Sequence, residues 1–296
     1  MVPRRVRAVG IMAVVTSALA CGDAPADEPI VLQDVGFMTP ESVLHDVVAD
    51  VYLVSNINGV PFDEDDNGFI SRISPDGEIL ELKWIDGADD GVTLNAPKGM
   101  AIAGGSLFVA DINTIRLFDR AAGEPIGAVP VEGSTFLNGV AAGPDGEIYF
   151  TDSGFERGFE PSGTDAVYRL NDGGVVETLA VGDDLGRPNG IAMDARGLWI
   201  VTFGANALYR LDGGSQTDRA ELPDGGLDGL VILEDGSVVV SSWNAQSVYH
   251  GPVGGPFEVM VSGVEAPADI GYDAMRNRIM IPLFQSDVVR IEPMNQ

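Results

Sequence analysis

The sequence predicts an all-β protein, a single six-bladed β-propeller over residues 30–296, and three features point to it. One unit recurs six times, successive units lie 39 to 57 residues apart, and the chain of 296 residues contains 38 glycines and 18 prolines. A four-stranded propeller blade repeats every 40 to 50 residues or so, whereas solenoid repeats are shorter or helical. Many short strands joined by tight turns also explain this composition better than helices do.

Each repeat has a polar residue followed by a small one, an apolar strand, a turn and a second strong strand. Two weaker strand signals follow, for example 69–73 and 78–84 around the turn Ser74-Pro75-Asp76-Gly77, so each unit has four strands. The last unit is one strand short. We expect Ile30–Met38 to supply the missing outer strand and close the propeller, which removes open sheet edges. The copies begin at Pro40, Pro97, Leu137, Pro188, Leu227 and Pro267.

The first twenty residues are typical of a secretory signal. Three arginines precede an apolar run over 8–20, which is too short to span a bilayer. It ends in Ala18-Leu19-Ala20-Cys21, similar to the bacterial lipobox, and Cys21 is the only cysteine. We predict a signal peptide over 1–20, lipidation of Cys21, a linker over 21–29 and an exported lipoprotein of the periplasm or cell surface. The alternative is an ordinary cut after Ala20 that releases a soluble protein.

The chain is strongly acidic, with a formal net charge of −28 at pH 7, and loss of the three signal arginines makes it −31. Such a charge repels nucleic acid and anionic membrane surfaces. We therefore expect a small-molecule substrate, no nucleic-acid partner, membrane contact only through a lipid anchor, and a monomer.

The first strand of each blade lies nearest the axis, so the residues that begin these strands converge on one mouth. Two carboxylates and two amide carbonyls at this register are hard oxygen donors, which suit Ca²⁺ at about 2.3 to 2.6 Å. A lone Asn-Gly or Asp-Gly is usually a turn, but four donors at one register predict a site for Ca²⁺ or another hard divalent cation. The second residues of the repeats are Glu41, Lys98, Asn138, Asn189, Asp228 and Ala268.

These residues resemble a known family, the group of senescence marker protein (regucalcin), gluconolactonase and luciferin-regenerating enzyme. In that family a Glu of the first blade, Asn of the third and fourth and Asp of the fifth surround a divalent cation. Glu41, Asn138, Asn189 and Asp228 match these positions in order. The resemblance covers nearly the whole mature chain and implies a calcium-dependent hydrolase of a lactone or related ester.

Two features distinguish this chain. One is a departure from the sugar-lactonase pattern in the third blade, and the other is a lysine in the ring. Those lactonases have Arg-x-Asn-Asp in the third blade, whereas this chain has Phe136-Leu137-Asn138-Gly139, which indicates a less polar substrate or a lost activity. Lys98 either anchors an anionic substrate group or oxyanion, or pairs with Glu41 or Asp111.

The mechanism that we expect follows from the ion. Ca²⁺ would polarise the carbonyl, and Asp228 first, or Glu41 second, would take a proton from the attacking water. The loops 56–68 and 153–165 follow second strands and therefore rim the mouth, where Phe62 and Phe155 are possible apolar walls for the substrate.

Two other interpretations complete the sequence analysis. His45 and His250 are interpreted as structural, because His45 lies within the first inner strand, where an aromatic residue is common, and His250 follows an outer strand. The competing function is a non-catalytic propeller of the NHL-repeat type that binds a protein or small ligand outside the cytoplasm, because propellers carry many functions. An ion-binding mouth with an accessible water site would favour the hydrolase.

Overall fold

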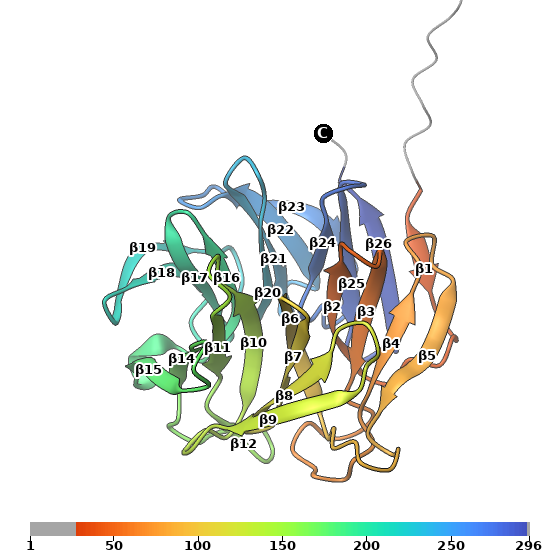
Figure 1. Cartoon of the computed structure of the whole chain (residues 1–296). Helices are drawn as coiled ribbons and strands as arrows, with labels where there is room; N and C mark the ends of the chain where they lie inside the picture. Colours follow the sequence, from red (N-terminus) through yellow and green to blue (C-terminus); the bar gives the residue numbers. More distant parts are fainter. Residues whose placement is uncertain (1–27, 295–296) are drawn as a thin grey trace, which may run out of the picture.

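A computed structural model of the chain describes residues 28–294. These residues form six four-stranded antiparallel sheets that surround one axis as the blades of a propeller (Figure 1). Apart from a 3-10 turn at Asp183–Leu185, their regular structure is β-strand. The predicted all-β, six-bladed fold is confirmed.

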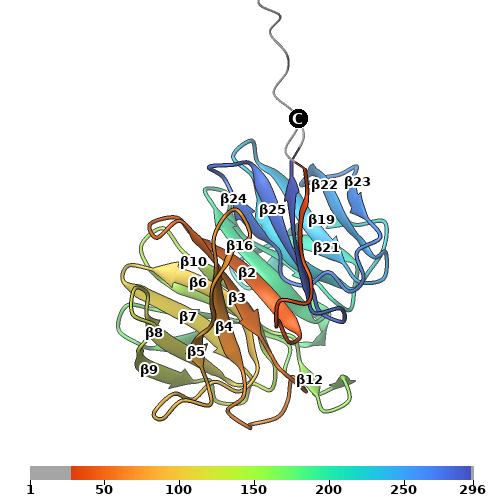
Figure 2. The ribbon, with the colours of Figure 1, turned by 90° about the vertical axis from the view of Figure 1, so that its right-hand side faces the viewer.

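Blades one to five each use four strands in the order of the chain, as Figure 2 shows for blade one. Blade one is β2 (Pro40–Asp46), β3 (Val51–Asn56), β4 (Phe69–Ile73) and β5 (Ile79–Asp86); blade two is β6 (Pro97–Ala103), β7 (Ser106–Asp111), β8 (Thr114–Asp119) and β9 (Pro125–Pro130); blade three is β10 (Leu137–Ala142), β11 (Ile148–Asp152), β14 (Ala166–Leu170) and β15 (Val176–Val181). Blade four is β16 (Pro188–Asp194), β17 (Gly197–Thr202), β18 (Ala207–Asp212) and β19 (Ser215–Glu221), and blade five is β20 (Leu227–Ile232), β21 (Ser237–Ser242), β22 (Ser247–Pro252) and β23 (Glu258–Ser262).

Blade six joins the two ends of the chain. It combines β24 (Gly271–Asp273), β25 (Arg278–Leu283) and β26 (Val288–Pro293) with β1 (Ile30–Leu32). β1 runs antiparallel to β26, with Ile30 opposite Ile291, so the predicted closing strand is confirmed. It is shorter than expected, because pairing stops at Leu32.

The core lies between neighbouring blades. Every residue of β3 is buried, whereas β9 at the rim has no buried residue. In blade three the rings of Phe150 and Tyr168 stack 5.3 Å apart and pack against Ala101 and Ile115 of blade two. A blade therefore buries its apolar face only against another blade, which holds the inner strands rigidly around the axis.

Two insertions lengthen the loops after second strands, at 57–68 in blade one and 153–165 in blade three. The second contains a small hairpin of β12 (Phe155–Glu156) and β13 (Glu160–Pro161). Arg157 Nη2 of this hairpin lies 2.6 Å from Asp63 Oδ1 of the first insertion. The two loops thus contact each other across the face on which the inner strands begin.

Residues 1–27 and 295–296 lie outside the described part of the chain. The predicted signal peptide, the lipidation of Cys21 and residues 21–27 of the linker fall there and stay predictions. Within 28–294, no helix has the length and apolar character needed to cross a membrane.

Candidate metal and substrate site

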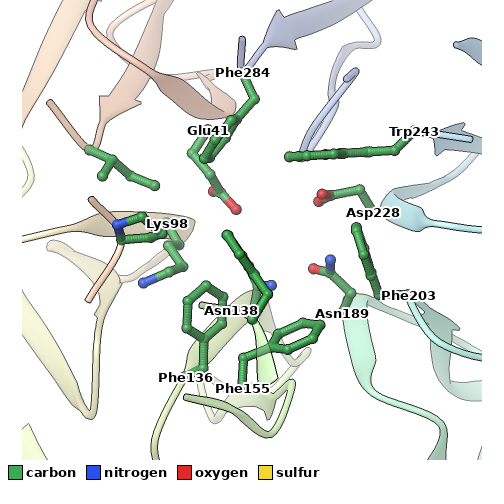
Figure 3. A pocket seen from close by; sticks show the side chains of 13 residues that line it. Glu41, Lys98, Phe136, Asn138, Phe155, Asn189, Phe203, Asp228, Trp243 and Phe284 are labelled. Carbon is green, nitrogen blue, oxygen red and sulfur yellow. The ribbon is translucent and has the colours of Figure 1, made fainter. Parts of the chain in front are cut away.

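Five of the six ring positions carry polar side chains that line one pocket at the axis (Figure 3). Each is the second residue of its inner strand, and each is at most 4% exposed. Ala268, the sixth position, has no donor. The five are Glu41, Lys98, Asn138, Asn189 and Asp228.

A recurring irregularity of the inner strands aims these side chains at the axis. In blades two to five the register between first and second strand shifts directly after the strand begins. Such a bulge leaves a residue out of the ladder and turns its side chain. The Asn-Gly steps therefore lie inside inner strands and not in hairpin turns.

The residue after the donor must be small because adjacent inner strands nearly touch. A Cβ atom on Gly139 would lie 2.4 Å from the carbonyl oxygen of Asn189, and one on Gly190 would lie 2.2 Å from that of Asp228. Only glycine permits this approach. The close packing brings donors of successive blades to a common centre.

The deciding observation is that four buried oxygen atoms of the ring have no hydrogen-bond partner. Buried polar atoms are nearly always paired, and leaving one unpaired costs about 1 to 3 kcal/mol. A hard cation would satisfy all four together. Within 28–294 no three His, Cys, Asp or Glu side chains are arranged so that they could hold a metal ion by themselves, so any ion here depends on the amide donors as well. The atoms are Glu41 Oε2, Asn138 Oδ1, Asn189 Oδ1 and Asp228 Oδ1.

Ser153 fixes the orientation of one amide donor. Asn138 Nδ2 donates to Ser153 Oγ at 3.1 Å, and the hydroxyl in turn donates to the carbonyl of Pro188 at 2.8 Å. With its NH₂ group held in this way, Asn138 presents its Oδ1 atom to the ring. Second contacts of this kind orient metal-binding side chains in general.

The carboxylates of the ring destabilise each other in the absence of a cation. Burial raises the pKa of Glu41 well above its usual range, and the charges of Asp228 and Asp269 raise it further. Burial and Asp269 also raise the pKa of Asp228, against a smaller lowering by Trp243 and Asn189. A cation between the two carboxylates would reverse these shifts.

Asp269 is a third carboxylate beside the ring that the sequence pattern missed. Ser42 Oγ donates to Asp269 Oδ2 at 2.6 Å across the junction of blades one and six. Desolvation inside the propeller raises the pKa of Asp269 to about 6, so it is mostly ionised at neutral pH. A signal was available, because the residue after the ring position is glycine in blades two to five but Ser42 and Asp269 in the other two.

Lys98 is held apart from the carboxylates. Its Nζ atom donates to the carbonyl of Ala96 at 3.1 Å and lies 4.3 Å from the centre of the Phe136 ring. Asp111 pairs instead with Arg116, at 2.9 Å, so the salt bridge considered for Lys98 is not formed. Burial lowers the pKa of Lys98 to about 8 even though Glu41, Asp111 and Asp152 oppose the shift.

Aromatic side chains surround the ring. Phe136 and Phe155, two of the residues predicted to contact the substrate, line the pocket. Phe62, the third, packs behind them, with its ring centre 5.0 Å from that of Phe136. The sequence analysis missed other lining residues that directly follow second strands in blades one, four, five and six. These are Ile57, Phe203, Trp243 and Phe284.

The pocket is small and partly covered. Its enclosed space is about 30 Å³, enough for an ion or a few water molecules, whereas ligand pockets measure about 300 Å³ or more. Phe159 covers it from the second insertion and contacts Phe62 of the first, with ring centres 5.3 Å apart. Separation of these two insertions would widen the entrance for an organic ligand.

The fold is that of several solved enzymes. A structure assigned as a gluconolactonase superposes with a TM-score of 0.69 at 19% identity, covering 91% of this chain and 93% of that one. The luciferin-regenerating enzyme gives 0.65 at 15% identity, with 90% and 96% covered. This chain has their six-bladed fold. These are the enzymes whose family the sequence resembles.

Other chemistry occurs on the same fold. Virginiamycin B lyase from Staphylococcus aureus gives a TM-score of 0.61 at 15% identity and covers 90% of this chain and 99% of that one. No protein-family model matches the chain, and no curated protein matches it in sequence. At these identities the likeness shows the fold, so the activity must be argued from the site.

Proposed function

We propose that the protein is a calcium-dependent hydrolase of a lactone or related ester, with its site at the propeller mouth. The observation that carries the proposal is the set of four buried, unpaired oxygen atoms contributed by Glu41, Asn138, Asn189 and Asp228. Gluconolactonase-like and luciferin-regenerating neighbours support hydrolase chemistry in general. Hard oxygen donors favour calcium over zinc or softer ions.

The charges around the ring support a divalent ion. Glu41, Asp228 and Asp269 carry three negative charges when ionised, and Lys98 carries one positive charge. The two negative charges that remain would be balanced by one Ca²⁺, and Asp152, which also acts on Lys98, adds to the negative potential of this region. Lys98 is turned toward Phe136 and Ala96, which leaves the centre of the ring to the ion.

In this proposal the side chains of the site have separate roles. A bound calcium ion would act as a Lewis acid on the substrate carbonyl. Asp228, or else Glu41, accepts the proton of the attacking water, and the Lys98 ammonium offers a positive charge to a negatively charged substrate group. Phe136, Phe155 and the other aromatic residues bind an apolar acyl or alcohol group and exclude water, which favours aryl or alkyl esters and apolar lactones over sugar lactones.

The proposal is tested first on the native protein. We expect one calcium per chain in elemental analysis of protein purified without added metal, and turnover of some member of a lactone and aryl-ester panel that a chelator abolishes. Stoichiometric calcium without turnover would instead favour the ligand-binding propeller. Export with lipid on Cys21 stays part of the proposal and is tested by mass spectrometry of the mature amino terminus.

The Asp228→Ala variant is the matching genetic test. Removal of this carboxylate takes away one donor and one charge, so we expect calcium affinity to fall by at least about 10²-fold and hydrolysis to disappear. Isothermal calorimetry measures the first effect and the ester assay the second. A variant that keeps both calcium and activity would exclude the mechanism.

A further inference from the structure

The mouth contains one unused hydrogen-bond donor, the indole N–H of Trp243. Its Nε1 atom is buried and has no hydrogen-bond partner, as is true of the four ring oxygens. An indole nitrogen can only donate, so a metal ion cannot satisfy it. Trp243 lines the pocket at the axis, and none of the acceptors there meets hydrogen-bond geometry with this group.

The indole is held firmly in place. Phe203 and Phe284 flank it, with ring centres 5.6 Å and 5.1 Å away (Figure 3). The backbone N–H of Trp243 donates to the carbonyl of Gly226 at 2.9 Å. A donor fixed before the ligand arrives costs little reorganisation when charge develops near it.

The Trp243 N–H lies beside the ring but is not tied up in a hydrogen bond to one of its side chains. The indole N–H approaches Asp228 closely enough to lower its pKa by a weak hydrogen-bonding interaction, but the two groups do not meet the geometry of a formed hydrogen bond, and Trp243 Nε1 and Asp228 Oδ1 both remain without such a partner. Trp199 in blade four shows the contrast, because its Nε1 atom donates to Asp194 Oδ1 at 3.1 Å. The indole N–H of Trp199 is thus paired, whereas that of Trp243 is not.

We propose that the Trp243 indole N–H donates a hydrogen bond to the acyl oxygen of the substrate, most strongly when that oxygen becomes negatively charged. This inference rests on the proposed function, since it names a donor for the same reaction. The four ring oxygens are all acceptors and give the substrate oxygen no hydrogen bond. Trp243 supplies such a hydrogen bond. It lies in the same blade as Asp228, next to the blade that contains Asn189.

The sharpest test replaces Trp243 by 3-benzothienylalanine, which keeps the shape of the side chain but has sulfur in place of N–H. We expect kcat for the best ester of the panel to fall by about 10²-fold, with KM within about threefold. Phenylphosphonate, a stable tetrahedral oxyanion, serves as the binding probe on calcium-loaded protein. Its affinity should fall by roughly tenfold, while calcium affinity without the probe stays within about twofold.

Trp199→Phe is the matched control, because it removes an indole N–H that is already paired outside the mouth. We expect its kcat, its KM and its phenylphosphonate affinity to equal those of the native protein. The variant Trp243→Phe repeats the test with a smaller ring and guards against poor incorporation of the analogue.

The possible outcomes separate the two proposals. Unchanged kcat and phenylphosphonate affinity in the analogue would overturn the Trp243 inference and leave the hydrolase intact. A parallel loss of calcium affinity would also overturn it, because Trp243 would then act through Asp228. Native protein that binds neither calcium nor phenylphosphonate and hydrolyses nothing would remove the proposed function and this inference with it. Weaker phenylphosphonate binding in the analogue, without any native turnover, would support the donor and overturn the hydrolase.

Discussion

Two groups of acidic side chains, one at the mouth and one where the propeller closes, have opposite electrostatics. In the ring at the mouth, burial and mutual repulsion raise the pKa values of Glu41 and Asp228. In the second group, where blade one meets blade six, the Arg276 guanidinium lowers the pKa of Asp50 to about 2. The groups differ in whether the protein itself supplies the counter-charge.

The second group is completely paired by the protein. Arg276 binds Asp50 and Asp273, and Tyr52 Oη donates to Asp273 Oδ2 at 2.6 Å. Burial works to raise the pKa of Asp273, but the hydrogen bonds from Tyr52 and Arg276 outweigh it and lower the pKa. His45 lies in this network, 3.2 Å from Asp50, which agrees with its interpretation as a structural residue.

The difference separates two uses of acidic side chains. Carboxylates that have a cation of their own stabilise the junction that closes the propeller. Carboxylates that face unpaired oxygens across a small space cost stability unless an ion from outside arrives. The ring therefore has the features of a functional site, and the junction has those of a structural one.

The largest expected effect is on the junction. Asp273→Ala removes the acceptor of Tyr52 and a partner of the buried end of Arg276, so we expect the free energy of unfolding to fall by about 3 to 5 kcal/mol. Urea denaturation in the presence of chelator measures it. Calcium affinity of the folded variant should stay within about threefold.

In the same denaturation assay, Asp228→Ala should not lose stability. Without calcium we expect its stability to equal or exceed that of the native protein, because the variant loses a repulsive buried charge. A strong loss of stability in Asp228→Ala, or none in Asp273→Ala, would break the distinction between the two groups.

The next effect is the dependence of calcium stabilisation on pH. In the absence of metal the folded protein holds Glu41 and Asp228 at raised pKa values, so it binds more protons than the unfolded chain above pH ~4. Unfolding free energy must therefore fall as pH rises through this window. Bound calcium replaces the protons on Glu41 and Asp228, so the unfolding free energy no longer falls as the pH rises. At a fixed calcium concentration, a hundredfold above the Kd at pH 8, we expect Tm to rise by roughly 5 to 10 °C near pH 8, and by less near pH 5, where protons compete and Kd is higher.

Thermal unfolding with calcium and with chelator, from pH 5 to 8, measures this dependence. Calorimetry in buffers of different ionisation enthalpy adds the number of protons released on binding. A calcium effect that shrinks as the pH rises would contradict the raised pKa values at the ring.

Much of the fold and part of the site follow from the repeat. The period and the register of Glu41, Asn138, Asn189 and Asp228 were enough to predict six blades and the residues that meet at the axis. Register works here because every inner strand begins at the same end of its blade. The closing strand followed from the missing fourth strand of the last unit.

Other parts of the site depend on contacts that the repeat does not encode. Trp243 and Phe284 follow second strands, but their role appears only once the blades curve and bring them over the ring. Asp269 replaces a glycine of other repeats, and its charge matters because blades one and six meet at Ser42. The partly covered pocket depends on two insertions that meet from different blades, a contact that no local pattern specifies.

The smallest expected effect concerns this contact between the insertions. Arg157 and Asp63 have side chains that are 68% and 36% exposed, and exposed pairs stabilise proteins by about 0 to 1 kcal/mol. Arg157→Ala should therefore leave Tm within about 3 °C, yet the insertions separate more readily. We expect phenylphosphonate to associate about two- to fivefold faster in stopped-flow measurements.

Arg210→Ala is the control, because it removes the partly exposed ion pairs of Arg210 with Asp212 and Asp218 in blade four, outside the two insertions, and should leave the association rate unchanged. High salt screens exposed ion pairs, so it should bring the native rate close to that of Arg157→Ala while affecting that variant little. Equal rates for the native protein and Arg157→Ala at low salt would mean that the aromatic contacts of Phe62 and Phe159 alone close the mouth. The pair would then be a surface contact without influence on entry.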